Sequence, residues 1–331
     1  MTETTNDEFV IRHYQEGEEH KRAALVNACR TTDWDDFVTV DMIHNEWHDS
    51  RLNLDRDTWV AVNKDGDYIS VAEVWFDDPD NDEAVITRHV GFDMHPDYRE
   101  KHSDLTDELL KRALKHARSR PFARSDKGYV LRAWAPAKDA WKHDVALKHG
   151  FKHAHVGYTM IKDDLQDLPP ISSVEGIRIE GWSPERDLDF WLALNEGFST
   201  EMTFKALSWG EWLRLYHQDK MDQNLWCLAI DEHTDEVVGL AISEIDHKAN
   251  VETGRKDGWA VDLAVIKEWR GRGIGRTLLL TAMQKLRQAG MNAVKMGLDS
   301  YDPVNGTRLY RSLGFKVMYG SHTYLKTLKP Y

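Results

Sequence analysis

The chain has 331 residues, of which 41% are hydrophobic and 30% are charged, and its formal net charge is −13. This length favours two domains of ordinary size, and the composition is typical of globular proteins rather than disordered ones. No run approaches the roughly 18 apolar residues of a membrane span. Nucleic acids and anionic membranes bind basic surfaces, so the charge argues against both as partners. The negative net charge favours a cationic acceptor. The alternative is that the acidity only keeps the protein soluble.

The first residues of the chain and its two cysteines indicate the cellular compartment in which we expect the protein. The first eight residues are polar and acidic, without the basic start and the apolar stretch of a signal peptide. Cys29 and Cys227 lie far apart in the sequence. We therefore expect two free thiols in a cytoplasmic protein.

The first half of the sequence predicts a mixed order of strands and helices. Asp65-Gly66 is a hairpin turn signal between two of the strands. In chain order, the expected elements are a β-rich run at 9–12, helical patterns over about 16–49, strands at 58–62 and 68–71, a longer strand leading into a helix at 105–118, a further strand and helix, Gly150-Phe151, and a β-like tail.

The middle of the sequence has neither helical nor strand periodicity. Two adjacent prolines, Pro169 and Pro170, lie between polar flanks, which is typical of a linker. We therefore expect a first domain over residues 1–163, a linker over 164–174 and a second domain over 175–331.

The second half repeats the order of the first. Its expected elements are a β-rich run at 176–179, helical patterns over about 184–218, strands at 225–230 and 237–242, a longer strand leading into a helix at 274–288, a further strand and helix, Gly314-Phe315, and a β-like tail. The repetition predicts a mixed α/β fold that occurs twice.

A glycine-rich turn between an apolar strand and a helix is the most informative segment of the second half. Its glycines let the backbone approach a ligand, and the free N–H groups and dipole of the following helix attract an anion. The glycines are Gly271, Gly273 and Gly275, and the charges come from Arg270, Arg272 and Arg276. The pattern suits a pyrophosphate, and an ordinary strand–helix turn is the alternative.

Two other phosphate-binding motifs do not fit this turn. A dinucleotide-binding G-x-G-x-x-G motif would need a glycine where Arg276 stands. A P-loop would need Gly-Lys-Ser/Thr, which the turn lacks.

Two motifs of the second half resemble signatures of the GNAT acyltransferase superfamily. Arg270-x-x-Gly273-x-Gly275 after a strand is similar to motif A of that family. Further along, Leu309-Tyr310 followed by Leu313-Gly314-Phe315 is similar to its second signature. The resemblance covers the whole second half and, in degraded form, the first. It implies two tandem GNAT-like domains with an α/β fold built on a mixed sheet.

The resemblance implies an acetyl-CoA-dependent N-acetyltransferase in which the acceptor amine attacks the thioester directly in a ternary complex. It assigns acetyl-CoA to the strand end, whose backbone pairs with the pantetheine arm, and to the turn and helix start. The residues at these places are Leu263, Ala264, Val265, Arg270, Gly271, Arg272, Gly273, Ile274, Gly275 and Arg276.

One part of the family pattern differs here. The family often has Asn seven or eight residues before the helix tyrosine, where this sequence has Pro303 and Asp302. Asp302 before Pro303 is a good helix N-cap, so we expect it to be a cap first and a cofactor contact second. Asn305 is a further candidate contact.

Tyr310 and Asp262 are the candidate catalytic residues. The resemblance assigns Tyr310 as the acid, and a tyrosine, whose ordinary pKa is about 10, stays protonated and can donate to the leaving thiolate. A core aromatic is the alternative. Asp262 is a polar position in an apolar strand, so it is the candidate base, through a water. A solvated strand face or an ion pair are its alternatives.

The first half lacks the same residues. Its arginine persists as Arg99, but His102 and Asp104 stand at two of the glycine positions, Gly91 at that of the base and Ala146 at that of the acid. A side chain and a carboxylate at the anion site disfavour binding. We therefore expect a non-catalytic domain.

The acceptor wall is expected in the helical pair of the second half, where acidic and aromatic residues could hold an amine with an apolar body. The candidates are Glu196, Glu201, Trp209 and Trp212, and the alternative is that the aromatics are core. The expected partner is a small-molecule primary amine, bound by a monomer or homodimer. No metal is expected, because the histidines of the first half lack the spacing and partners of metal ligands.

Two other functional classes stay open. Some tRNA-dependent aminoacyltransferases have tandem GNAT-like folds, but they need basic surface and no pyrophosphate loop. A non-catalytic acetyl-CoA sensor is the other class, against which Tyr310 argues.

Overall fold

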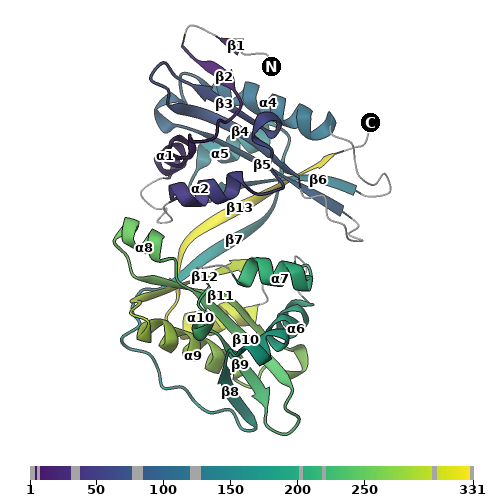
Figure 1. The fold of residues 1–331 in the computed structure, drawn as a ribbon, viewed down its shortest axis with the longest axis vertical. Coiled ribbons are helices and arrows are strands. Elements are labelled where there is room, and N and C mark those ends of the chain that lie inside the picture. Colours follow the sequence, from purple (N-terminus) through teal and green to yellow (C-terminus); the bar gives the residue numbers. More distant parts are fainter. Residues whose placement is uncertain are drawn as a thin grey trace. The chain divides into compact units, whose positions relative to one another are not determined.

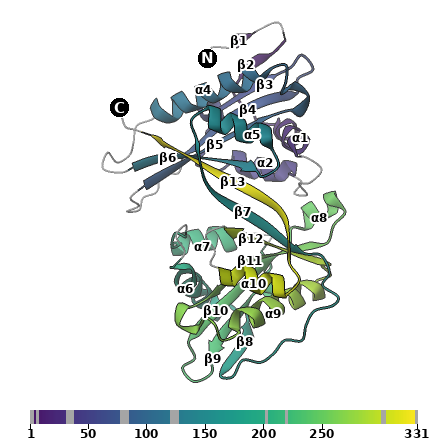
Figure 2. The same ribbon diagram turned by 180° about the vertical axis from the view of Figure 1, so that it is seen from behind.

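The computed structural model describes residues 4–5, 8–30, 38–76, 85–119, 128–200, 204–217, 221–299 and 304–328. The chain forms two compact units, drawn in Figure 1 and from behind in Figure 2. The N-terminal unit contains residues 1–156 and 319–331, and the C-terminal unit contains residues 157–318.

A mixed sheet is the centre of the N-terminal unit. Its strands lie in the order β1-β2-β3-β4-β5-β6-β13, and neighbours are antiparallel except β5 and β6, which are parallel. They are β1 (Thr4–Thr5), β2 (Val10–Arg12), β3 (Thr58–Val62), β4 (Tyr68–Phe76), β5 (Val85–Met94), β6 (Gly128–Pro136) and β13 (Lys316–Leu328). The helices are α1 (Glu19–Cys29), α2 (Val40–Trp47), α3 (Leu54–Asp57), η1 (Pro96–Tyr98), α4 (Ser103–Ser119) and α5 (Ala140–Lys148).

Both faces of this sheet are covered. Val60 of β3 packs in one apolar cluster with Leu25 of α1 and Ile43 of α2. Ala61, the next residue, packs in another cluster with Leu109 of α4. Successive strand residues point to opposite faces, so α1 and α2 cover one face and α4 the other.

The C-terminal unit has the same plan. Its strands lie in the order β7-β12-β11-β10-β9-β8, and the pair β11–β12 is parallel. They are β7 (Lys152–Lys162), β8 (Ile177–Gly181), β9 (Cys227–Asp231), β10 (Val237–Glu244), β11 (Asp257–Val265) and β12 (Ala293–Asp299). The helices are η2 (Pro184–Arg186), α6 (Asp187–Phe198), α7 (Trp209–Tyr216), η3 (Gln223–Leu225), α8 (His247–Thr253), η4 (Lys267–Trp269), α9 (Ile274–Gln288) and α10 (Val304–Ser312).

Different helices again cover the two faces of the second sheet. Leu228 of β9 packs in one cluster with Phe190 of α6. Cys227 packs in another with Leu278 of α9. The expectation of a mixed α/β fold that occurs twice is thus confirmed. Within the described residues, no helix combines the length and the apolar character that crossing a membrane requires.

The two β-like tails end in the opposite unit from the one expected. Residues 157–162 of β7 pair antiparallel with β12 of the C-terminal unit. Residues 321–328 of β13 pair antiparallel with β6 of the N-terminal unit. The compact units therefore differ at their tails from the expected domains, 1–163 and 175–331, because each sheet takes its last strand from the other half of the sequence.

The expected linker, residues 164–174, contains no helix or strand, but it packs closely. Leu165 is fully buried in the core of the C-terminal unit, and its N–H binds the carbonyl of Asn292 at 3.0 Å. The hydroxyl of Thr277 donates to the carbonyl of Ser172 at 3.1 Å. This segment is thus an irregular part of the C-terminal unit.

Candidate active site

A β-bulge interrupts β11 beside the candidate base. Ile242 of β10 lies opposite Asp262. The next residue of β10, Ser243, lies opposite Ala260, so Val261 is an extra residue in β11. A bulge bends its strand and redirects nearby side chains.

Beyond the bulge, one edge of β11 has no strand neighbour among the described residues. The pairing of β11 with β12 runs only from Asp257 to Trp259, whereas the pairing with β10 continues to Val265. Backbone groups alternate in direction along a strand, so alternate N–H and C=O groups after Trp259 point away from β10. Leu263, Ala264 and Val265 lie on this stretch. An extended chain can bind such an edge as an added strand would.

The turn after β11 takes conformations that favour glycine. Gly271 has φ +79° and Gly273 has φ +92°. Gly273 is the N-cap of α9 and supplies no side-chain cap, so the first N–H groups of the helix are left for another acceptor. The Ile274 side chain is buried in the core, so only its backbone can face a ligand. Gly275 has space for a Cβ, at 3.6 Å from Val265.

Arg270 joins the end of β11 to α6. Its guanidinium donates to the carbonyl of Val265 at 2.9 Å and to that of Gly197 at 2.8 Å. In the N-terminal unit, Arg99 makes the corresponding bond to the carbonyl of Met94 at 3.1 Å. The arginine present in both halves thus binds the carbonyl of the last strand residue. Its contact with a cofactor stays a prediction.

The other two arginines of the turn are also held by protein groups. Arg272 lies over the ring of Trp269, at 4.6 Å from its centroid. Arg276 donates to the hydroxyl of Ser312 at 3.1 Å. A guanidinium has five N–H donors, so each arginine keeps donors for an anion.

Asp262 lies half-buried on β11 and accepts a hydrogen bond from the hydroxyl of Tyr216 at 2.8 Å. Burial raises the pKa of Asp262 to about 6, while the bond from Tyr216 lowers this pKa and the charge of Glu244 raises it. Among the described residues no cation pairs with Asp262, so the ion-pair alternative is not observed. A carboxylate with this pKa is ionised at neutral pH and more basic than an ordinary aspartate.

Sequence reasoning missed Tyr216. This residue ends α7, is 9% exposed and stacks on Trp212, with ring centroids 4.4 Å apart and planes at 20°. Burial and the charge of Asp262 raise the pKa of Tyr216, so its hydroxyl stays a donor. The spacing of four between Trp212 and Tyr216 places both on one helix face and was the available signal.

Tyr310 lies on α10 and is 8% exposed. It belongs to the same apolar cluster as Ala260 and Ala264 of β11, and its ring meets Phe315 edge to face at 6.1 Å. The packed ring matches the core alternative, and a core ring beside β11 is compatible with an acid role. That role stays a prediction.

The expected acceptor wall is only partly brought together. Glu196 is exposed on α6, and Trp209 is partly exposed on α7 with its ring edge-on to Trp191 at 5.8 Å. Trp212 is fully buried, which matches the core alternative, so it contacts the site through Tyr216. Glu201 and Asp302 lie outside the described residues, as does the side chain of Asn305.

The corresponding strand of the N-terminal unit, β5, has no bulge where it pairs with β4. Residues 70–76 of β4 pair with residues 88–94 of β5 without a shift of register. The parallel pairing of β5 with β6 ends at His89, so β5 also has an open edge.

A group of paired charges lies at the end of β5. Asp93, which aligns with Ala264, accepts hydrogen bonds from Lys142 of α5 at 2.7 Å and from Arg22 of α1 at 3.0 Å. Both cations hold the pKa of the Asp93 carboxyl below its usual range, although burial opposes them. These three largely buried side chains form an ion-paired group on β5 at a position that Ala264 occupies in β11.

The sequence and fold agree with known acetyltransferases. Residues 190–315 match the acetyltransferase (GNAT) family. Mycothiol acetyltransferase of Pseudarthrobacter chlorophenolicus is 27% identical over 235 residues, which cover 69% of this chain and 68% of that protein. Mycothiol acetyltransferase of Renibacterium salmoninarum is 25% identical over 244 residues, covering 70% and 68%.

Two solved structures share the fold over nearly the whole chain. A GCN5-related N-acetyltransferase from Sphaerobacter thermophilus has a TM-score of 0.80 and 21% identity, with 99% of this chain and 98% of that one covered. A tandem GNAT protein from the clavulanic acid biosynthesis pathway has a TM-score of 0.68 and 14% identity, covering 98% and 99%. The comparisons therefore identify an N-acetyltransferase whose residues 190–315 match the GNAT family and whose two units have GNAT-like folds in tandem.

Proposed function

We propose that the C-terminal unit transfers an acetyl group from acetyl-CoA to the primary amine of a small molecule, and that the N-terminal unit is non-catalytic. The observation that carries this is the position of Asp262. Its carboxylate lies on the strand that has an open edge, three residues before the strand end that leads to the uncapped start of α9. A base, a site for an extended thioester and an anion site thus follow one another along one segment.

The residues divide the chemistry between them. The backbone of Leu263–Val265 binds the pantetheine arm, and the N–H groups at the start of α9 bind the pyrophosphate. Asp262 accepts a proton from the acceptor ammonium, directly or through a water. The freed amine attacks the thioester carbonyl carbon, the C–S bond breaks, and Tyr310 protonates the leaving thiolate; the second proton, lost from the nitrogen as the amide forms, restores Tyr310.

Several features support a small cationic acceptor. The curated relatives are named for acetylation of mycothiol, which is a statement about those proteins. In this chain, Glu196 and Glu244 add negative charge on elements next to β11, and the net charge is −13. An ammonium group is attracted by such a field.

Thiol release from acetyl-CoA with a panel of primary amines tests the proposal. We expect release with at least one amine, and Asp262→Asn should lower kcat/KM by about 100- to 10,000-fold while acetyl-CoA affinity is unchanged. Asp104→Asn, an exposed carboxylate of the N-terminal unit, is the control and should turn over like the wild type. Acetyl-CoA binding without thiol release for any amine would instead identify a sensor.

Melting temperatures give the same variant a second readout. The pKa of Asp262 is raised to about 6 in the folded protein, above the ordinary value of 3.8, so its ionisation costs folding free energy. This cost is absent below about pH 4 and complete above about pH 6. Asp262→Asn should therefore melt at a higher temperature than the wild type at pH 8 and at the same temperature at pH 4.

A further inference from the structure

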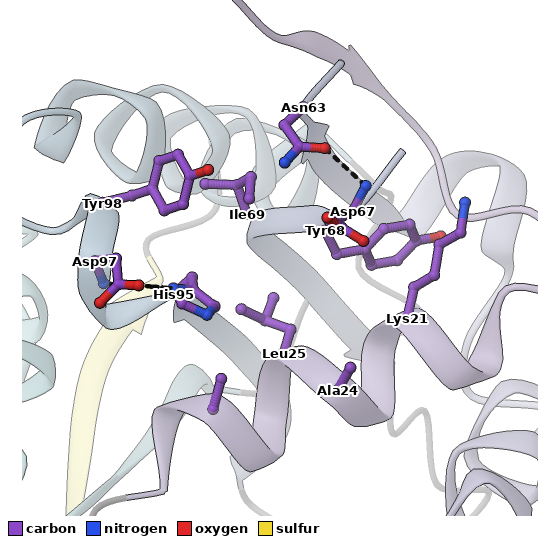
Figure 3. A pocket seen from close by; sticks show the side chains of 11 residues that line it. Lys21, Ala24, Leu25, Asn63, Asp67, Tyr68, Ile69, His95, Asp97 and Tyr98 are labelled. Atoms are coloured by element: carbon purple, nitrogen blue, oxygen red, sulfur yellow. Dashed lines mark hydrogen bonds and ion pairs between the residues drawn. The ribbon is translucent and has the colours of Figure 1, made fainter. Parts of the chain in front are cut away.

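The N-terminal unit contains a cavity that the proposed acetyl transfer does not use. It has a volume of about 270 Å³ and lies between α1, the turn that joins β3 to β4, and the residues that follow β5 (Figure 3). All of its lining residues belong to the N-terminal unit. A cavity of this size can hold a small organic molecule.

Small side chains on α1 make the hollow. Ala24 and Ala28 lie one helical turn apart and line the same wall. Leu25 and Ile69 complete its apolar surface, and each is 2% exposed. An apolar group that entered the cavity would be removed from water against these four side chains.

The charge of the rim is negative. Figure 3 shows Asp67 and Asp97 on different walls. Among the described residues, Asp67 has no cationic partner, and Asp97, whose side chain is 83% exposed, meets only His95 at 3.8 Å. The rim cation, Lys21, is bound by Glu18 at 2.6 Å and is not free for an anion.

An aromatic ring adds to the attraction for a cation. Tyr98 lines the cavity on the wall formed by η1, and Figure 3 shows its ring beside Ile69. Aromatic rings stabilise nearby ammonium groups through their quadrupole. The cavity thus combines an apolar wall, an aromatic ring and two carboxylates on its rim.

We propose that this cavity is a second ligand site, which binds a small amine with an apolar body. The ammonium group lies between Asp67 and Asp97, and the apolar body lies against Leu25 and Ile69. The site is separate from the residues that carry out acetyl transfer, so binding here does not depend on the proposed function.

Titration of the full chain with 2-phenylethylamine, in the absence of acetyl-CoA, tests this site. We expect amide NMR signals of Ala24, Ala28 and Ile69 to shift, and the neutral analogue 2-phenylethanol to bind about tenfold more weakly. Ala28→Leu should abolish the shifts by filling the cavity. Ala24→Leu, at an exposed position, is a second blocking variant for the case that Ala28→Leu lowers the melting temperature.

Charge variants and controls complete the experiment. Asp67→Asn combined with Asp97→Asn should make the amine and the alcohol bind equally. Ala206→Leu, an exposed alanine of the C-terminal unit, should leave amine binding unchanged. The proposal is wrong if 3-phenylpropionate binds as tightly as the amine, if shifts occur only in the C-terminal unit, or if both blocking variants bind the amine like the wild type.

Discussion

Strands β5 and β11 occupy the same place in their units, and each leaves a parallel neighbour before its end. On β11 a bulge at Val261 precedes an open backbone edge. On β5 the register against β4 is regular, and Asp93 near the strand end is bound by Lys142 and Arg22. The comparison teaches that two units with the same strand order can differ at one strand, and the buried charges on β5 support the proposal that the N-terminal unit does not bind the cofactor.

The arginine after each strand shows which part of the motif serves the fold. Arg99 and Arg270 both donate to the carbonyl of the last strand residue. Arg99 also binds Asp139 with two hydrogen bonds of 3.1 and 3.2 Å. The arginine thus has a structural role in both units, whereas the role of the glycines in anion binding stays a prediction.

Gly273→Asp should have the largest effect on this comparison. It places a side chain and a carboxylate at the start of α9, as Asp104 does in the other unit. We expect acetyl-CoA affinity to fall by more than about 100-fold, measured by calorimetry. Gly290→Asp is the matched control, because Gly290 has φ +87° and an open Cβ position, so it carries similar strain without facing the anion site. Equal affinity in both variants would make the glycine turn a structural feature only.

Tyr310→Phe should lower turnover by about 100-fold and leave acetyl-CoA affinity nearly intact. The change removes one hydroxyl and keeps the ring that packs against Phe315. Because the donor is used only as the thiolate forms, kcat and kcat/KM should fall together. Wild-type turnover at pH 7 would identify Tyr310 as a core residue alone.

Tyr216→Phe should change the pH dependence of kcat/KM more than it changes the maximal rate. The hydroxyl of Tyr216 lowers the pKa of Asp262, so its loss should move that pKa above about 6. The acid limb of kcat/KM then shifts to higher pH, with a rate near that of the wild type at pH 8.5. Tyr158→Phe, an exposed tyrosine of β7, is the control and should leave the limb in place. If the acid limb of kcat/KM does not move in Tyr216→Phe, the hydroxyl of Tyr216 does not influence the pKa of Asp262.

The combined substitution His102→Gly with Asp104→Gly should have the smallest effect. It restores two glycines of the N-terminal unit but leaves Asp93 bound to Lys142 and Arg22. We therefore expect calorimetry to show one tight acetyl-CoA site per chain, as in the wild type. A second tight site would mean that the glycines alone separate the two units.

Local chemistry explains what could be predicted from the sequence. The turn with Gly271 and Gly273 was readable because positive φ and an uncapped helix start are requirements of a few adjacent residues. The helix expected at 274–288 is α9 itself. Asp262, a polar residue between Val261 and Leu263 in an apolar stretch of β11, could be found by inspection, and its half-buried position is observed.

Long-range pairing explains what was missed. The bond from Tyr216 to Asp262 joins α7 to β11, and it lies next to the bulge at Val261; adjacent residues encode neither feature. The exchange of tails was missed because both tails are β-like, and their partners are chosen by contacts far along the chain. The buried group around Asp93 could not be foreseen, because it unites three separate elements.

Because the tails are exchanged, each half of the chain supplies a strand to the sheet of the other half. A deletion of the first 163 codons would remove residues 157–162, the antiparallel neighbour of β12, and expose that strand as a template for aggregation. Loss of the last codons would likewise unpair β6 from residues 321–328. Each sheet therefore takes its last strand from the other half of the sequence, and neither sheet is complete when its half is expressed alone.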